Sequence, residues 1–224
     1  MNAETSALPR RKRHWLRWTL AGVAALLVLL VAGAVAAVKL QPVPSPLTLP
    51  VNPAPSSGPL NGAYQPTTGS LAGFRIQQSF LGVTSEMVGR TPDITGTVTA
   101  TGDRVTAASL RINLLALTSG GKKPAPQYNI SLDTEHYPDA TVTLTQPVAL
   151  SQVATATGTL TLHGVTRTVT ATMSIRQDGA GLDVAGSLPV AFADYRLAQP
   201  TGYGSLGSLA DHGTAEFLLL LRRP

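Results

Sequence analysis

Hydrophobic and polar residues alternate along most of the chain after residue 60, and the clearest alternation spans residues 158–175. Leu160 and Leu162 alternate with threonines up to His163 and Gly164, which we interpret as turn residues. Two alternating runs joined by two residues that end in glycine predict a β-hairpin, because this turn needs positive φ angles. Beyond the turn, the residues that share the apolar face are Val165, Val169, Ala171, Met173 and Ile175.

The turn at residues 163–164 also predicts the register of this hairpin. Leu162 then opposes Val165, and Leu160 opposes Arg167, so one arginine lies on an otherwise apolar face. One interpretation is a solvated arginine whose stem lies along apolar surface. The other is an arginine that binds a phosphate or carboxylate head group, because its planar guanidinium forms paired hydrogen bonds with such groups.

Shorter alternating segments occur on both sides of the hairpin, and glycine, proline and aspartate separate them. Regular spacing of such segments predicts an all-β sandwich or barrel. The connection at residues 124–137 is the longest and has room for a short helix. The apolar residues that share a face within the segments include Phe74, Ile76 and Phe80; Ile94, Val98 and Ala100; Leu110, Ile112 and Leu114; and Val142 and Leu144.

The hairpin sequence GTLTLHGVTRTVTATMSI resembles the signature hairpin of the YceI-like family of lipid-binding (polyisoprenoid-binding) domains. Other parts are similar to that family in the same order: NGAYQPTTGSLAGFRI, EHYPDATVTL, PVAFADYRLAQP and DHGTAEFLLLLRR. The resemblance covers roughly residues 60–223. It implies a lipocalin-like antiparallel β-barrel of about eight strands that holds an apolar lipid, either an isoprenoid or an acyl chain.

Residues on the inward faces of the predicted strands are the candidate contacts for such a lipid. Barrels of eight strands either fill their interior with side chains or hold one small ligand, so a filled barrel that serves as a structural or interaction module is the alternative. Small residues at expected inward positions favour a cavity: Gly96, Ala100, Ala171 and Gly186. The candidate ligand-binding residues are Phe74, Ile76, Phe80, Leu110, Ile112, Leu144, Leu160, Leu162, Arg167, Ala171, Phe192 and Phe217.

The N-terminal part of the chain predicts a single transmembrane helix. Residues 18–38 form an uncharged run of 21 residues, which spans about 31 Å as a helix and is long enough to cross a bilayer. The basic leader at residues 1–17 is expected to stay in the cytoplasm, which places the barrel outside it. A cleaved signal peptide with a site near Ala34 and Ala36 is the alternative, and the barrel is then secreted; signal segments have shorter apolar regions.

Residues 39–59 predict a proline-rich linker between this helix and the barrel domain at residues 60–224. Residues 41–59 contain seven prolines, and proline cannot donate to a β-ladder. An extended spacer of this kind, at about 3.1 Å per residue, reaches tens of ångströms.

Charge and motifs exclude several classes of function. The net charge of +5 arises in the N-terminal part, because residues 60–224 contain eleven basic and eleven acidic residues; we therefore expect no nucleic-acid partner. Cysteine is absent, and no paired histidines suggest a metal site. Residues 202–207 match G-x-G-x-x-G, but a strand follows where a dinucleotide site requires a helix. We predict neither an enzyme nor a cofactor.

Residues 217–221 are apolar at five consecutive positions. In a strand, alternate side chains point to opposite faces, so some of these residues point away from the barrel interior. Exposed apolar strand surface is usually covered. A homodimer is the partner expected from this pattern.

Overall fold

The computed structural model describes residues 12–40, 43–51, 53–56, 58–123, 131–199 and 207–224. These residues belong to two compact units, Met1–Pro42 and Val43–Pro224. The first unit contains one helix, α1 (Lys12–Lys39). Its segment Trp18–Ala36 has a mean hydropathy of 2.5, and its length and composition suit a membrane span or a signal sequence equally. The expected apolar N-terminal helix is confirmed, whereas the leader up to residue 11 lies outside the described residues.

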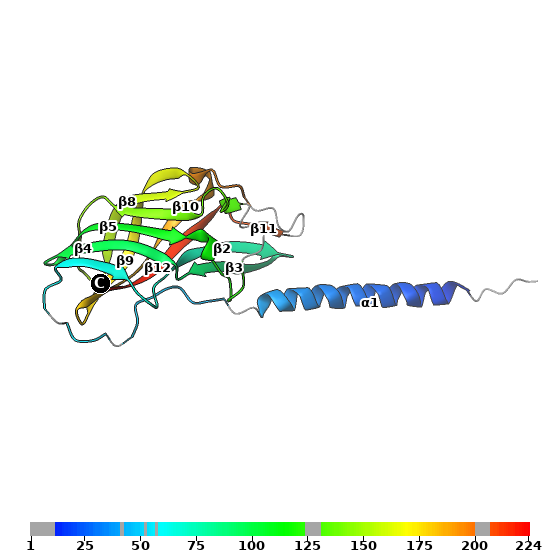
Figure 1. Cartoon of the computed structure of the whole chain (residues 1–224). Coiled ribbons are helices and arrows are strands. Elements are labelled where there is room, and N and C mark those ends of the chain that lie inside the picture. The colour runs from blue at the N-terminus through cyan, green and yellow to red at the C-terminus, as the bar shows by residue number, and fades with distance from the viewer. Residues whose placement is uncertain (1–11, 41–42, 52, 57, 124–130, 200–206) are drawn as a thin grey trace, which may run out of the picture. The chain divides into compact units, whose positions relative to one another are not determined.

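The second unit consists mostly of antiparallel strands (Figure 1). Two short 3-10 helices interrupt them, η1 (Leu114–Ala116) and η2 (Phe192–Tyr195). The strands are β1 (Gly62–Pro66), β2 (Leu71–Phe80), β3 (Val83–Thr91), β4 (Ile94–Thr101), β5 (Arg104–Asn113), β6 (Asp139–Leu144), β7 (Val148–Ala149), β8 (Ala154–Leu162), β9 (Val165–Asp178), β10 (Gly181–Ala191), β11 (Gly207–Leu209) and β12 (His212–Arg222).

Eight of these strands close into a barrel. Their order is β1-β4-β5-β6-β8-β9-β10-β12, and β12 pairs back with β1 through Gln65 opposite Arg222. Between β1 and β4 in the sequence, β2 and β3 form a hairpin with each other. β11 and β12 both pair with β2, on the edge opposite β3. The predicted antiparallel barrel of about eight strands is confirmed.

The hairpin predicted at residues 163–164 has the expected turn and register. His163 and Gly164 have φ angles of 52° and 69°, which suit a two-residue turn that follows the twist of the strands. Leu160 lies opposite Arg167, and Leu162 lies opposite Val165. The local alternation of residue types therefore determined this part of the fold.

The barrel has a base and a mouth. The base carries the turns at residues 102–103 and 179–180, and the mouth carries η1, η2 and the turns at residues 81–82 and 163–164. At the base, fully buried side chains pack into one core cluster, among them Leu60, Tyr64, Leu182 and Leu221. This packing closes the barrel at the end where the first strand begins.

The proline-rich segment, residues 43–59, lies along the outer wall of the barrel. Its described residues form neither helix nor strand, as expected from the prolines. However, its backbone carbonyls accept hydrogen bonds from the barrel, for example Pro44 from Arg75 and Pro50 from Arg176. The expected extended spacer is therefore corrected in one respect, since it contacts the barrel: prolines leave carbonyl groups without ladder partners, and barrel arginines bind them. We call residues 43–59 the strap.

Two further expectations concern segments near residue 131 and β12. Within the long connection, Ser131 and Leu132 are helical, whereas residues 124–130 lie outside the described residues. Residues 202–206 of the glycine-rich motif also lie outside the described residues.

On β12, the outward side chains of Leu218 and Leu220 are half-buried within the single chain. Because the chain itself shields these side chains, the structure does not support a homodimer at this strand.

Candidate ligand-binding cavity

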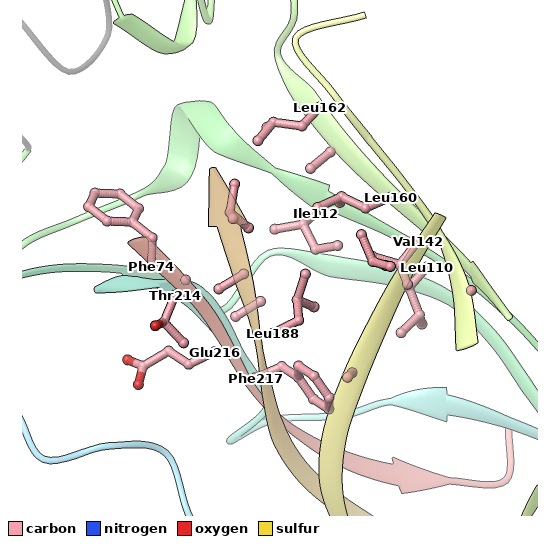
Figure 2. A pocket seen from close by; sticks show the side chains of 18 of the residues that line it. Phe74, Leu110, Ile112, Val142, Leu160, Leu162, Leu188, Thr214, Glu216 and Phe217 are labelled. Carbon is pink, nitrogen blue, oxygen red and sulfur yellow. The ribbon is translucent and has the colours of Figure 1, made fainter. Parts of the chain in front are cut away.

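The barrel encloses a cavity of about 260 Å³ that extends from the mouth toward the base. This volume lies near the lower end of the range for small-molecule pockets, about 300–1,000 Å³. Nearly all of its lining is aliphatic or aromatic. Figure 2 shows Leu160, Leu188 and Phe217 among the side chains that surround this space, whereas the carboxylate of Glu216 points away from it. The cavity thus suits an apolar molecule.

The strands position these side chains by their alternation. On β12, Phe217 and Leu219 share the inward face, while Glu216 and Leu218 share the outward face. The same alternation places most of the candidate residues of the sequence around the cavity. The ten that line it are Phe74, Ile76, Leu110, Ile112, Leu144, Leu160, Leu162, Ala171, Phe192 and Phe217.

Phe80 does not line the cavity, although it shares the parity of Phe74 and Ile76. Phe80 is the last residue of β2 and lies opposite Val83 and Gly207. At this point the β2–β3 hairpin has passed the rim of the barrel, so an inward side chain no longer faces the interior.

Arg167 also lies outside the cavity lining. Pairing between β9 and β10 ends at Thr172 opposite Ser187, so the mouth end of β9 is an edge beside η2. There Arg167 is exposed, and its Nε donates to the carbonyl oxygen of Asp194 at 3.1 Å. This arrangement favours the solvated arginine over a head-group contact within the cavity.

The lining also includes residues that are not among the candidates from the sequence. Leu188 and Val190 continue the alternation of β10 and were detectable from it. Leu114 and Leu117 lie at η1 and Leu197 follows η2, and their position depends on how the chain turns at the mouth. No periodicity in the sequence indicates these contacts.

Only one of the four small residues expected to leave room, Ala171, lines the cavity. Ala100 is buried in the core cluster at the base. Gly96 and Gly186 instead allow close approach, because a Cβ atom would lie 2.1 Å from the carbonyl oxygen of Ser109 and 2.7 Å from the ring of Phe217, respectively. The other small residues that line the cavity lie at different positions, among them Ala72, Ala140, Ala156 and Ala215.

Aromatic residues pack at the mouth near η2. The rings of Tyr137 and His163 lie 4.7 Å apart, and Nδ1 of His163 lies 3.1 Å from the carbonyl oxygen of Tyr195. His163 is thus more than a turn residue, since it connects the hairpin to η2. The hydroxyl group of Tyr195 is buried and has no hydrogen-bond partner among the described residues.

The pKa of Tyr195 is raised, mainly by burial and then by the charge of Asp194, while Arg167 opposes the shift. At the outer surface, a hydrogen bond with Asp133 raises the pKa of His136, and one with His212 lowers the pKa of Asp211. None of these groups lines the cavity.

Among the described residues, no three His, Asp or Glu side chains gather as a metal site requires. The cavity itself offers burial of apolar surface rather than acid–base chemistry.

Comparison with protein families agrees with this geometry. The model of the YceI-like domain matches residues 64–217. The chain belongs to the YceI-like family. This family consists of binding proteins, and no curated protein matches the chain.

Solved structures with a similar fold include the following two. The first is a polyisoprenoid binding domain from Saccharophagus degradans implicated in plant cell wall breakdown, with 19% identity, a TM-score of 0.55, and coverage of 72% of this chain and 98% of that one. The second is BcnA of Burkholderia cenocepacia, with 20% identity, a TM-score of 0.52, and coverage of 68% and 96%. At this identity the likeness concerns the fold alone.

Proposed function

We propose that this YceI-like barrel binds a single long apolar chain, an isoprenoid or acyl lipid, inside its cavity. The observation that carries the proposal is the continuous apolar lining contributed by strands around the barrel, from Phe74 on β2 to Phe217 on β12. The polyisoprenoid binding domain from Saccharophagus degradans has the same fold and supports this class of ligand.

Cavity size sets the scale of the interaction. With about 30 Å³ for each water-sized group, a cavity of about 260 Å³ accepts roughly nine methylene groups. At ~0.8 kcal/mol for each buried CH₂, these groups contribute about 7 kcal/mol before the costs of association. Discrimination between chains is expected to be weak, because a misfit of one methylene is worth only ~1–3 kcal/mol.

The proposed site comprises the ten predicted residues that line the cavity, together with Leu188 and Val190 of β10. Arg167 and Phe80 are not included, for the structural reasons given above. We assign no catalytic role to the site, because its lining offers no nucleophile with an adjacent base. A barrel without bound ligand, acting as an interaction module, remains the competing function.

We further propose that α1 is a retained membrane anchor that leaves the barrel outside the cytoplasm. The uncharged run at residues 18–38 behind a basic leader supports this orientation. The proposed organisation is a leader at residues 1–17, an anchor at 18–38, a linker at 39–59 and the barrel at 60–224. Sequencing the N-terminus of the mature protein tests the anchor, and a mature start at Ala37 or Val38 would show that the helix is removed.

Native mass spectrometry of the protein purified without denaturation, followed by lipid extraction, tests the ligand. We expect an additional mass that disappears on extraction with organic solvent and corresponds to one lipid per chain. The protein stripped of lipid is then titrated with polyisoprenoids and fatty acids. If no lipid is purified with the protein and none of these binds, the carrier function is rejected and the interaction module is favoured.

A further inference from the structure

The strap follows a defined path down the outer wall of the barrel. Near the mouth, Pro44 and Ser45 accept hydrogen bonds from Arg75 on β2 and Arg90 on β3. Near the base, the N–H of Ala54 donates to Oδ1 of Asp178 at 2.5 Å. The strap therefore runs from the mouth half to the base, where the chain turns back into β1.

Buried carboxylates hold the arginines that bind the strap. Glu216 lies 2.7 Å from Arg90 and 3.5 Å from Arg75, and its side chain is only 5% exposed although it points outward. Asp183 lies 3.8 Å from Arg176, which in turn donates to the carbonyl oxygen of Pro50 at 2.6 Å. Charged hydrogen bonds are stronger than neutral ones and fix geometry, so the path of the strap is well defined.

This path shortens the connection between the barrel and α1. The helix ends at Lys39, and the strap first contacts the barrel at Pro44, so five Cα–Cα steps separate them. At about 3.3–3.6 Å per step, these residues span at most about 18 Å in any conformation. The first docked residue contacts Arg75, which lies opposite Thr214, two residues from the mouth end of β12. The chain thus leaves the barrel in its mouth half.

Three exposed large apolar side chains lie at this end of the barrel. Leu81 at the β2–β3 turn is 36% exposed, Leu115 in η1 is 56% exposed, and Tyr137 beside His163 is 37% exposed. In the described part of the second unit, the other exposed large apolar residues are Val153, which lies toward the base, and Val43 and Val51 of the strap. The cavity lining reaches the mouth at the partly exposed Leu132, Leu162 and Leu197.

We propose that the mouth of the barrel docks on a lipid bilayer through Leu81, Leu115 and Tyr137, and that the strap directs the mouth toward that bilayer. This inference rests on the proposed membrane anchor and apolar ligand, and it adds a surface for transfer. Exposed apolar residues that surround a site mark an interaction surface. A bilayer is the occupant that fits, because the short connection at the mouth half leads to a helix long and apolar enough to span one.

The absence of cysteine makes a direct test practical. Single-cysteine variants of the full chain, Leu81→Cys, Leu115→Cys and the control Val153→Cys, are labelled with an environment-sensitive fluorophore. Each is reconstituted into phosphatidylcholine vesicles with and without brominated acyl chains. We expect brominated lipid to quench the probes at positions 81 and 115 and to leave the probe at position 153 unchanged. Absence of quenching at both mouth positions, or equal quenching at all three, overturns the proposal.

A second variant tests the role of the strap. A flexible Gly/Ser insertion of about 20 residues after Leu40 lengthens the connection by roughly 25 Å on average and leaves the barrel unchanged. We expect weaker quenching at position 115 in this variant. Unchanged quenching would show that the strap does not direct the mouth. A change in probe fluorescence that depends on protein concentration instead of on brominated lipid would identify a second copy of the chain as the occupant. Either result overturns the proposal as stated.

Lipid content, measured on the same samples by native mass spectrometry, separates this inference from the proposed function. A barrel that carries lipid but shows no quenching at the mouth retains its ligand function without this docking surface. A barrel that shows quenching but never carries lipid has the docking surface without the proposed ligand.

Discussion

Arg90 donates from Nε to Oε1 of Glu216 at 2.8 Å, and both side chains lie on the outer face of the barrel. Outward charges on a sheet are normally solvated, yet Glu216 is almost completely buried. The strap explains this burial, because Arg90 also donates to the carbonyl oxygen of Ser45. An ion pair that would be a minor surface feature becomes part of an internal interface between the strap and the wall.

We predict that Glu216→Gln destabilises the protein strongly. The substitution keeps the shape but leaves Arg75 and Arg90 without their shared buried counter-charge, which costs about 3–5 kcal/mol. The control is Glu86→Gln, which removes a partner of Arg75 that is 38% exposed and is expected to cost about 1 kcal/mol or less. Urea unfolding measures both free energies. Equal effects in the two variants would contradict the burial of Glu216 under the strap.

We predict that Leu160→Asp is severe. Leu160 is buried and lines the cavity, and an unpaired carboxylate in apolar surroundings costs several kcal/mol. Thr155→Asp is the control on the exposed face of the same strand, with an effect of about 0.5 kcal/mol or less. Thermal unfolding compares the variants. A Leu160→Asp protein that melts within a degree or two of the parent would disprove the inward assignment.

We predict that Ala171→Phe blocks lipid binding while the barrel stays folded. Ala171 lines the cavity, so the larger side chain occupies ligand volume; overpacking is expected to cost about 1–3 kcal/mol of stability. Thr170→Phe, on the neighbouring exposed position, should bind lipid normally. Lipid titration and circular dichroism are the measurements. Normal binding by a folded Ala171→Phe protein would place the ligand elsewhere.

We predict that Gly96→Ala costs about 3 kcal/mol or more, because the strain of its backbone conformation alone is of order 1–3 kcal/mol. Gly96 has a φ of +128°, and a Cβ atom would meet the carbonyl oxygen of Ser109. Gly102→Ala is the control, since Gly102 has a φ of +63° with open space around it, and its cost is about 1–2 kcal/mol. Similar unfolding free energies would show that β4 and β5 can separate locally.

Local alternation in the sequence was sufficient to predict much of this fold. The hairpin at residues 163–164, the opposition of Leu160 and Arg167, and the inward face of β12 all follow from a period of two. That period depends only on residues close in the chain, because successive side chains of a strand point to opposite faces. Ten of the twelve candidate residues line the cavity for this reason. Their contact with a ligand stays a prediction.

The tertiary structure alone decided where this pattern stops and what covers the outer wall. Phe80 and Arg167 have inward parity, but they lie where the barrel has ended or where β9 has lost its partner β10. The strap binds Arg176 through Pro50, a residue 126 positions earlier in the chain. Proline-rich sequence has no periodicity to indicate a partner, and the buried carboxylates that hold these arginines come together only when the barrel closes. Contacts of this kind depend on the three-dimensional path of the chain, which local residue patterns do not contain.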